Sequence, residues 1–362
     1  MIKKILHIIS IAFALLLLLS YLTAYIPPSL YPKFSLFGFL YPVLLAINIG
    51  FIILWLFLKW TYIILPLAVI LIRVDYIPSL YRLNGQSHIE VKEDRELKIL
   101  SYNVCSFHYK TEYNEPKDKR IEEIFEYIKK ENPDVLALQD YNSLKKGNKA
   151  IHRRIVNELG LEHYFIANNS SKYLFGNAIY SRYPINKSGT LFPLKENNNA
   201  YIFADIEFEG REIRVYNFHL TSFKLADKEK KTFESLKKGE IKKEESKNIL
   251  KKLIWANDKR SKEVDEIIPI LSETKIPYFV VGDFNDTPFS YTYRKLITNM
   301  KDAFEKKGRG FGSTFNGVFP AYRIDYILYS DKDFEVKSFE KQDLDYSDHY
   351  PISSVFEVKE VK

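Results

Sequence analysis

Polar side chains stand directly after several short apolar runs, and their types are those that bind cations and transfer protons. The run Tyr278–Val281 leads into Gly282 and Asp283, and Asn285 follows two residues later. Glycine permits a close approach of two backbones, and residues two apart on an extended chain point to the same side. This segment is the most specific of the series. It predicts a carboxylate and an amide directed at one site.

Three other apolar runs end in amide, imidazole or carboxylate side chains. Asn217 and His219 alternate with apolar residues, so both point to one side of a predicted strand. Asn103 ends one run, and Gln139 with Asp140 ends another. Each is weak alone, because an Asn or Asp after a strand is more often a turn residue and a single His more often belongs to the core.

The carboxy-terminal part contributes a carboxylate in an apolar setting and an acid–imidazole pair. Asp325 lies among the apolar residues of Ile324–Tyr329, and a buried carboxylate needs a partner. Asp348 and His349 are neighbours in the sequence Ser-Asp-His. These residues add a candidate proton acceptor and a candidate cation ligand.

The runs that carry these residues predict a layered α/β domain. Short runs rich in Val, Ile, Tyr and Phe predict strands, and charged segments with apolar residues at three-and-four spacing predict helices. The predicted strands are Leu97–Val104, Val135–Leu138, Ala178–Ser181, Tyr201–Phe208, Ile213–His219, Tyr278–Val281, Ile324–Tyr329 and Ile352–Val358; the predicted helices are Asp118–Asn132, Ala150–Leu159 and Lys247–Ile268. Two sheets packed face to face with helices outside satisfy this pattern, although periodicity alone does not separate them from other α/β arrangements.

Taken in chain order, these segments resemble the motif series of the endonuclease/exonuclease/phosphatase superfamily, the deoxyribonuclease I-like proteins, over Glu96 to Val358. The motifs are Gly-Asp-Phe-Asn at 282–285, Arg-Ile-Asp-Tyr-Ile at 323–327 and Ser-Asp-His at 347–349, with a family-like central segment at 176–185. The resemblance implies a four-layered α/β sandwich with the site at one edge of the paired sheets. It also implies hydrolysis of a phosphate ester with a divalent cation, usually Mg²⁺ and sometimes Mn²⁺ or Ca²⁺.

The resemblance assigns the metal to oxygen ligands. Asn103 and Asp140 would hold it, with Asp348 a further ligand on the same rim, and hard oxygen ligands suit Mg²⁺. Asn217 would shape the phosphate-binding pocket. One departure stands out, because the family usually has Gln-Glu where this chain has Gln139 and Asp140, one methylene shorter. A catalytically inactive, membrane-tethered binding protein is therefore kept as an alternative.

The resemblance also assigns catalytic roles. His349 would act as general base toward the attacking water, with Asp283 or a neighbouring carboxylate orienting it or sharing that duty. His219 and Asn285 would bind the non-bridging phosphate oxygens, where negative charge builds in the transition state. Asp325 would orient His219 and raise its proton affinity. The expected reaction is metal-assisted, in-line attack of water on phosphorus.

The first part of the chain is nearly free of charged residues and predicts a membrane anchor. The apolar runs 5–26 and 36–58 are each long enough to cross a hydrocarbon core of roughly 30 Å, and the run 60–72 is shorter and contains Pro66. A cleaved signal peptide is the alternative for the first run. With Lys3 and Lys4 inside, three crossings place the rest of the chain outside the cytoplasm, and two leave it inside. We favour three.

We therefore expect an anchor of two or three transmembrane helices over residues 1–75, a linker over 76–95 and a catalytic domain over 96–362. The single cysteine, Cys105, excludes an internal disulfide. A polytopic anchor with a disulfide-free domain indicates an integral protein of a bacterial inner membrane, with the catalytic domain extracytoplasmic if the chain crosses three times and cytoplasmic if it crosses twice.

The expected function is a membrane-anchored phosphodiesterase that is either nuclease-like or active on lipid, and the alternative is a phosphomonoesterase acting on inositol- or sugar-phosphate substrates. The net charge of +7 favours anionic substrates without choosing among them. The expected partners are the phosphate-ester substrate, nucleic acid or a phospholipid headgroup, and the lipid bilayer, with no obligate protein partner. Three arginines keep nucleic acid in consideration, namely Arg182, Arg309 and Arg323.

Two further features leave alternatives open. The aromatic residues Tyr173, Phe175, Phe311 and Phe315 predict either stacking platforms for nucleic acid or core packing, and we favour the core. The segment Phe223–Lys262 mixes lysine with glutamate. This mixture predicts an exposed helical face, or a surface that meets anionic lipid or nucleic acid.

Overall fold

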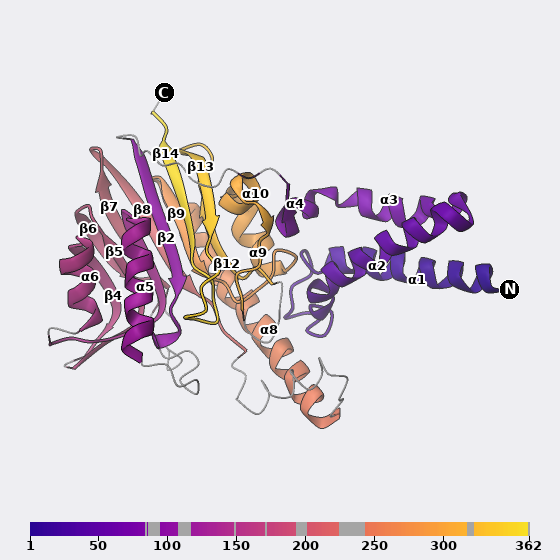
Figure 1. Ribbon diagram of the computed structural model, residues 1–362, viewed down its shortest axis with the longest axis horizontal. Helices are drawn as coiled ribbons and strands as arrows, with labels where there is room; N and C mark the ends of the chain where they lie inside the picture. Colours follow the sequence, from indigo (N-terminus) through magenta and orange to yellow (C-terminus); the bar gives the residue numbers. More distant parts are fainter. Residues whose placement is uncertain are drawn as a thin grey trace. The chain divides into compact units, whose positions relative to one another are not determined.

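Figure 1 shows the computed structural model of the chain, which describes residues 1–83, 85, 95–107, 117–147, 150–170, 172–192, 201–223, 243–316 and 322–360. The chain folds as two compact units. The helical unit comprises Met1–Tyr81, Ser222–Ile268 and Asp286–Thr298, and the sheet unit comprises Arg82–Thr221, Pro269–Asn285 and Asn299–Lys362. The two units interleave along the chain, and the domain boundaries expected at residues 75 and 95 stay predictions.

The sheet unit contains two sheets of six strands each. The first has the order β10-β12-β9-β8-β7-β6 and the second the order β13-β14-β2-β3-β5-β4. The first sheet consists of β6 (Ile185–Thr190), β7 (Tyr201–Phe208), β8 (Arg211–His219), β9 (Tyr278–Asp283), β10 (Lys301–Asp302) and β12 (Asp325–Tyr329). The second consists of β2 (Glu96–Asn103), β3 (Val135–Leu144), β4 (His163–Asn169), β5 (Tyr173–Ser181), β13 (Phe334–Lys341) and β14 (Ile352–Val358).

A parallel pair of strands lies at the centre of each sheet, β8–β9 in the first and β2–β3 in the second, and the other pairings are antiparallel. The sheets share an apolar core in which Leu97 and Val135 of the second sheet join Val215 and Phe279 of the first. Successive side chains of a strand point to opposite faces, so alternate apolar residues fill this core.

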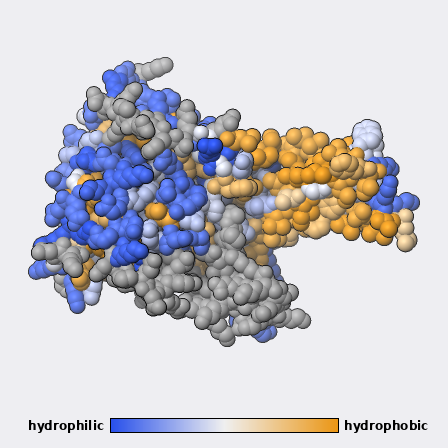
Figure 2. Space-filling model, viewed as in Figure 1, coloured by the Kyte–Doolittle hydropathy of each residue, from blue (hydrophilic) through white to orange (hydrophobic). Residues whose placement is uncertain are grey.

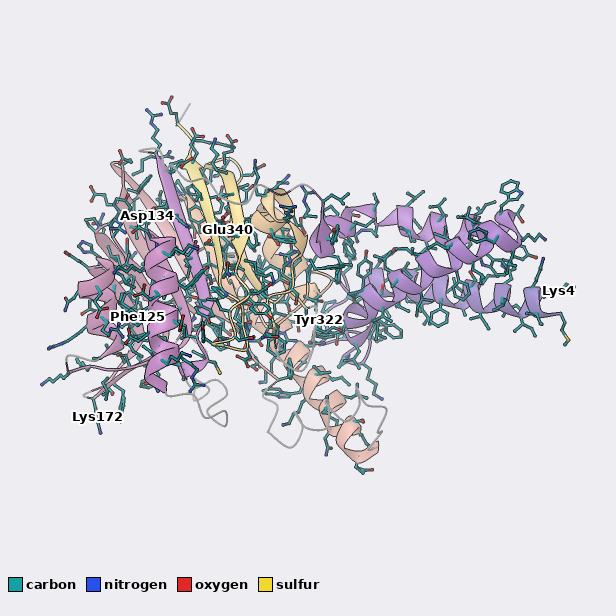
Figure 3. All side chains as sticks on the ribbon, in the orientation of Figure 1. Lys4, Phe125, Asp134, Lys172, Tyr322 and Glu340 are labelled. Atoms are coloured by element: carbon teal, nitrogen blue, oxygen red, sulfur yellow. The ribbon has the colours of Figure 1, made fainter. Side chains whose placement is uncertain are left out.

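Two helices cover the outer face of the second sheet, α5 (Lys117–Glu131) and α6 (Ile151–Leu159). Ile124 and Phe125 of α5 and Ile155 of α6 join a second apolar cluster with strand residues such as Leu136, and Figure 3 labels Phe125 on its helix. This mixed arrangement of two packed sheets with outer helices confirms the predicted deoxyribonuclease I-like α/β sandwich. The smaller elements of the sheet unit are η3 (Cys105–Phe107), α10 (Ala303–Lys307) and β11 (Gly310–Phe311).

The helical unit begins with a hairpin of two apolar helices, α1 (Ile2–Leu22) and α2 (Leu36–Leu58). Both are long and apolar enough to cross a membrane, and Figure 2 shows apolar side chains covering their surface. The segment that follows consists of η1 (Trp60–Ile63), α3 (Ile64–Ile72), η2 (Val74–Tyr76) and α4 (Ile77–Leu80). Its two halves, Trp60–Ile72 and Val74–Leu80, are bent by 60°, and the segment is a third candidate span only if both halves belong to one membrane crossing.

The later parts of the helical unit pack on this hairpin. They are the first part of α8 (Lys243–Glu273), the helix α9 (Tyr291–Leu296) and the segment before α9. Three elements contain residues of both units: α8, η4 (Ile297–Asn299) and β1 (Tyr81–Arg82). The ring of Phe289 is buried 4.0 Å from that of Tyr41 and 5.4 Å from that of Tyr76, measured between centroids. The hydroxyl of Thr23 donates to the carbonyl of Phe289 at 3.0 Å. The residues that follow Asn285 in the sequence therefore belong to the packing of the apolar hairpin.

Candidate active site

The central parallel strands of both sheets end at the predicted site residues. β8 ends at His219 and β9 at Asp283, and these two residues are register partners. β2 ends at Asn103, whose register partner on β3 is Gln139. Antiparallel β12 begins at Asp325, which is paired with Asp283 from the other side. Because carboxyl ends of parallel strands meet at one edge, the fold gathers polar side chains from both sheets there.

One carboxylate oxygen is the meeting point of the site. Oδ2 of Asp283 accepts hydrogen bonds from Nδ2 of Asn103 at 2.9 Å and from Nδ2 of Asn285 at 3.1 Å. The same oxygen lies 3.6 Å from Nε2 of His219 and 3.6 Å from Nε2 of His349. Four of the residues predicted from the sequence thus lie within 3.6 Å of this oxygen of a fifth, Asp283, which is itself fully buried.

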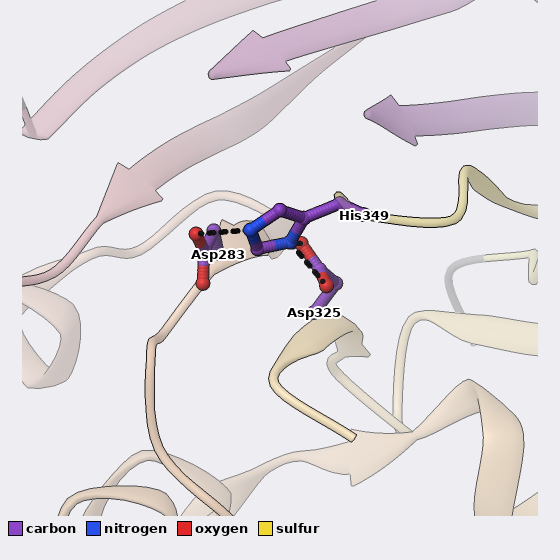
Figure 4. A group of neighbouring side chains, drawn as sticks. All are labelled: Asp283, Asp325 and His349. Carbon is purple, nitrogen blue, oxygen red and sulfur yellow. Dashed lines mark hydrogen bonds and ion pairs between the residues drawn. The ribbon is translucent and has the colours of Figure 1, made fainter. Parts of the chain in front are cut away.

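His349 and Asp325 form a buried pair on one side of Asp283, as Figure 4 shows. Nδ1 of His349 donates to Asp325, lying 3.1 Å from Oδ1 and 3.0 Å from Oδ2. Our expectation that Asp325 orients His219 is therefore wrong. Asp325 lies on β12, and β9 with Asp283 stands between β12 and the strand that carries His219.

The two members of this pair stabilise each other's charge. Burial alone lowers the pKa of His349, but the carboxylates of Asp325 and Asp283 outweigh burial and raise that pKa to about 10. Burial raises the pKa of Asp325 to about 6, against the opposing effect of His349. At neutral pH the pair is an imidazolium and a carboxylate. The backbone at Asp325 is fixed by Thr314, whose hydroxyl accepts from the N–H groups of Ile324 and Asp325 at 3.0 Å each.

The predicted metal ligand Asn103 is held in one orientation. Its Oδ1 accepts from the N–H of Cys105 at 3.0 Å while its Nδ2 donates to Asp283, which identifies the two ends of the amide by their partners. The hydroxyl of Ser347 donates to the carbonyl of Asn103 at 2.7 Å and keeps the neighbouring residue, Asp348, at the same strand end. The segment that carries Asp348 is thus bonded to the last residue of β2.

Asp140 completes the predicted ligand set. It follows Gln139, the register partner of Asn103, and its side chain is 47% exposed. Its Oδ1 lies 3.6 Å from Nδ1 of His219, a buried nitrogen that makes no hydrogen bond within the described residues. Two carboxylates and an amide oxygen are donor types that suit a hard divalent cation such as Mg²⁺, and the assignment of Asn103, Asp140 and Asp348 as its ligands stays a prediction.

Among the described residues, the group Asp283, Asp325 and His349 has the spacing of a metal site, because one donor atom from each lies within 4.8 Å of the others. Both carboxylate oxygens of Asp325 are, however, occupied by Nδ1 of His349. A charged imidazolium between two carboxylates satisfies the charge that a cation would otherwise balance. We therefore interpret this group as the acid–base part of the site rather than its cation ligands.

Asn217 lies behind the site and joins the two sheets. Its Oδ1 accepts from Nε2 of Gln139 at 2.7 Å, and its Nδ2 donates to the carbonyls of Leu138 and Ala178 at 2.9 Å each. The role predicted for Asn217, shaping the pocket, stays a prediction. Gln139 and Ser347 are residues to which the sequence assigned no role, although each lies within a motif that the sequence had marked. Thr314 gave no signal at all.

The backbone at the site is tight, and its residue types match that requirement. Gly282 has φ +126, and a Cβ there would lie 2.1 Å from the carbonyl oxygen of Phe218 on the neighbouring strand. Asp140 and Asn285 adopt positive φ values of 46 and 51. Asp and Asn tolerate this left-handed region better than other side chains, and such conformations cluster at functional sites.

The structure places the arginine and aromatic residues that the sequence had linked to nucleic acid in different environments. Arg323 is buried and pairs with the buried carboxylate of Asp302, so its predicted availability to nucleic acid is wrong. Phe311 is 61% exposed and Tyr173 is 41% exposed, contrary to the core packing that we favoured for them. The ring of Phe315 lies 5.3 Å from that of His349, at the site itself.

The fold and the site define a phosphoesterase of the deoxyribonuclease I-like class. Residues 100–349 match the sequence profile of the Endonuclease/Exonuclease/phosphatase family, which covers more than half of the chain. The chain belongs to this family, whose enzymes are metal-dependent hydrolases of phosphate esters. Residues 3–80 match a second profile, described as a domain of unknown function. A comparison with curated protein sequences finds no match.

Solved structures share the fold. Humanized D. rerio TDP2 with 14 mutations is 15% identical with a TM-score of 0.51, over 72% of this chain and 99% of that chain. D. rerio TDP2 complexed with a single strand DNA product is 16% identical with a TM-score of 0.50, over 72% and 98%. The human nocturnin catalytic domain with bound sulfate is 18% identical with a TM-score of 0.49, over 73% and 94%.

Proposed function

We propose that the chain is a membrane-anchored, Mg²⁺-dependent phosphodiesterase that hydrolyses its substrate with an activated water. The observation that carries the proposal is the convergence of four side chains on Oδ2 of Asp283: Asn103, Asn285, His219 and His349. Two amides and two imidazoles around one carboxylate supply donors for phosphate oxygens beside an acceptor for a proton. Phosphate hydrolysis needs both.

The donors would bind the phosphate. His219 and His349 each direct Nε2 at the same point, and Asn285 holds its Nδ2 there by a second bond to the carbonyl of Leu220 at 3.1 Å. Because these groups are buried and already oriented, they stabilise developing negative charge without reorganising. Asn285 N–H also donates to Oδ1 of Asp283 at 2.8 Å, which fixes the carboxylate plane.

Asp283 would take the proton of the attacking water, and the imidazolium of His349 beside it would stabilise that carboxylate rather than serve as the general base expected from the sequence. Oδ2 of Asp283 faces Nε2 of His349, and Asp325 holds the opposite nitrogen of the same ring, so the ring cannot turn away. Asn103, Asp140 and Asp348 would hold the cation, which when bound polarises the phosphoryl group and stabilises the leaving oxygen. Water is the only nucleophile that this arrangement requires.

Hydrolysis of bis-p-nitrophenyl phosphate by the full chain in detergent tests the proposal. We expect turnover with Mg²⁺ or Mn²⁺, none with EDTA, and a loss of roughly 10²–10⁴-fold in His349→Ala and Asp283→Asn. Asp331→Asn, at an exposed position, is the matched control. A folded chain without turnover under any metal would overturn the proposal, and turnover on p-nitrophenyl phosphate alone would assign a phosphomonoesterase.

Nucleic acid is the first natural substrate to assay. Phe315 places an aromatic ring beside His349, and stacking of a base on an aromatic ring contributes about 1–3 kcal/mol. A TDP2 structure with the same fold holds a single-stranded DNA product. Cleavage of a single-stranded oligonucleotide with a larger KM in Phe315→Ala would support a nuclease. Cleavage of phospholipid headgroups instead would assign a lipid phosphodiesterase.

The anchor is proposed to cross the membrane three times. Nζ of Lys3 donates to the carbonyl of Leu58 at 3.5 Å, so the start of α1 and the end of α2 lie together. The third segment starts at that end, where Tyr62 stacks on His7 at 3.6 Å. It reaches the opposite end, where Tyr21 donates to the carbonyl of Val69 at 3.0 Å. The segment therefore runs the length of the hairpin.

This arrangement supports an extracytoplasmic catalytic domain in a bacterial inner membrane. Lys3, Lys4 and Lys59 gather at one end of the hairpin, and Figure 3 labels Lys4 there. The other end carries Lys33 and also Arg73, which donates to the hydroxyl of Tyr25 just after α1. The positive-inside rule places the end with more lysine and arginine residues in the cytoplasm. After the third crossing, the chain continues toward β2 from the opposite side.

Labelling of intact cells with a membrane-impermeant maleimide tests the orientation. Lys332→Cys in a Cys105→Ser chain should be labelled in intact cells, and Lys4→Cys should be labelled only after lysis. Lys332 is exposed in the sheet unit, so the reagent has access to it on whichever side it lies. Labelling of Lys332→Cys only after lysis would place the catalytic domain in the cytoplasm.

A further inference from the structure

The exposed face of α8 carries a stripe of lysine and tryptophan. Lys251, Trp255, Lys259 and Lys262 follow one another at intervals of four, four and three residues, and all four are exposed. This spacing places them on one side of an α-helix. Trp255 is 46% exposed, and Leu250, beside the stripe, is 47% exposed. The stripe therefore combines an exposed tryptophan with a basic residue one turn away on each side.

The opposite face of α8 is fixed to the hairpin within the helical unit. Nδ2 of Asn257 donates to the hydroxyl of Ser35 at 2.7 Å. Nε of the fully buried Arg260 donates to Asp286 at 3.2 Å. Ser35 directly precedes the first residue of α2, so this contact attaches α8 at the end of the hairpin opposite Lys3. In Figure 1, α8 runs at a steep angle to α1 and α2.

We propose that this stripe is a docking surface for anionic phospholipid headgroups. The proposal rests on the membrane anchoring proposed above. If α1 and α2 cross the bilayer, their shared end lies at headgroup level, and Asn257 ties the part of α8 that carries the stripe to that level. Tryptophan is enriched at this depth, and lysine stems extend toward lipid phosphates. The apolar hairpin holds α8 beside lipid continuously, whereas a nucleic acid would have to diffuse to it.

The basic character of the stripe favours lipid of negative charge. Between Asn248 and Lys262, the exposed charged residues are all lysines, and the partly buried Asp258 is paired with Lys262 at 2.7 Å. Lys251 and Lys259 flank Trp255 on either side. Each lysine near an anionic surface contributes about 1 kcal/mol. Replacing both with glutamine should therefore lower the equilibrium constant for docking of the stripe on lipid by roughly 30-fold. This loss should appear in vesicles that contain phosphatidylglycerol and vanish in vesicles of phosphatidylcholine alone.

Quenching of Trp255 by brominated lipid measures the contact in the full chain. The chain has three tryptophans, so the signal of Trp255 is taken as the difference between the full chain and Trp255→Phe. Both are reconstituted into vesicles with bromine near the headgroup, with or without phosphatidylglycerol. We expect quenching with phosphatidylglycerol, its loss in Lys251→Gln/Lys259→Gln, and its retention in the matched control Lys187→Gln/Lys332→Gln, where both lysines are exposed in the sheet unit.

The outcomes separate the stripe from the anchor. The same vesicles are washed with alkaline carbonate, and extraction of the chain from them would overturn the proposed membrane anchoring. A retained chain whose Trp255 is not quenched would overturn the docking surface and leave the anchor standing. Quenching that is equal with and without phosphatidylglycerol would overturn the anionic preference. A change in Trp255 emission on adding an oligonucleotide, without quenching by lipid, would assign the stripe to nucleic acid instead.

Discussion

Nδ1 of His349 contacts both carboxylate oxygens of Asp325, at 3.0 Å and 3.1 Å, and both side chains are buried. Asp325 begins β12 in the first sheet, whereas His349 lies just before β14 in the second. The pair therefore joins the two sheets at the site. It also leaves Nε2 as the ring nitrogen that faces Asp283.

Asp325→Asn should reduce turnover and stability together. An amide in place of the carboxylate removes the charge that balances His349, and breaking a buried pair from one side costs about 3–5 kcal/mol. We expect kcat on bis-p-nitrophenyl phosphate to fall roughly 10²-fold or more, as for the loss of an acid–base group. Urea unfolding of the full chain and its kcat provide the two measurements. Unchanged kcat in a folded Asp325→Asn chain would remove the pair from the mechanism.

Gly282→Ala should prevent β9 from pairing with β8 in the first sheet. The added Cβ would meet the carbonyl of Phe218 at 2.1 Å, and φ +126 is itself strained for alanine. Gly210→Ala separates these two causes, because Gly210 also has a positive φ, +71, but has nothing within 4 Å. We expect about 1–2 kcal/mol lost in Gly210→Ala and a chain that does not fold in Gly282→Ala. Equal unfolding midpoints would show that the close approach does not matter.

The strands that the sequence did not predict lie at the edges of the sheets. β4, β6, β10 and β13 are the edge strands of the two six-stranded sheets; β6, β10 and β13 lack a continuous apolar run, whereas β4 contains the run Tyr164–Ala167, which the prediction missed. Edge strands are partly solvated and carry polar residues that protect them from pairing with other chains. The inner strands are mostly buried and their apolar runs predicted them, although β3 extends six residues beyond its predicted end at Leu138 and β5 begins five residues before its predicted start at Ala178.

The sequence motifs and the alternation along strands identified the site residues, but they did not predict which of these side chains contact each other. The sequence places Asn217 with His219 and Asp283 with Asn285, because alternation along a strand is local. It does not give the strand order β12-β9-β8, which puts Asp283 between Asp325 and His219. The partner of Asp325 was misassigned for that reason, since such a contact depends on the whole sheet.

Asp140→Glu should strengthen cation binding. Asp140 is the one predicted ligand that is shorter than the usual family residue, and its carboxylate is 47% exposed. A glutamate restores one methylene, so we expect half-maximal activity at a lower Mg²⁺ concentration. Loss of a residue that only hydrogen-bonds to a metal ligand typically weakens metal binding roughly 10–100-fold. Asp140→Ala removes a predicted ligand itself, so it should raise the Mg²⁺ concentration for half-maximal activity by at least that factor. Titration of activity with Mg²⁺ measures both, and identical titrations for all three chains would exclude Asp140 as a ligand.

Phe289→Ala should destabilise the helical unit far more than a substitution on its outer surface. The ring of Phe289 is buried against Tyr41 and Tyr76, and removing a buried phenylalanine costs about 3–5 kcal/mol. Phe57→Ala is the matched control, because Phe57 lies on α2 with 84% of its surface exposed. Thermal unfolding of the full chain in detergent should show a lower midpoint for Phe289→Ala and little change for Phe57→Ala. Because Phe289 follows Asn285 by four residues, kcat should also be measured at a temperature where both variants are folded. A midpoint for Phe289→Ala equal to that of the control would show that this segment does not pack on the hairpin as described.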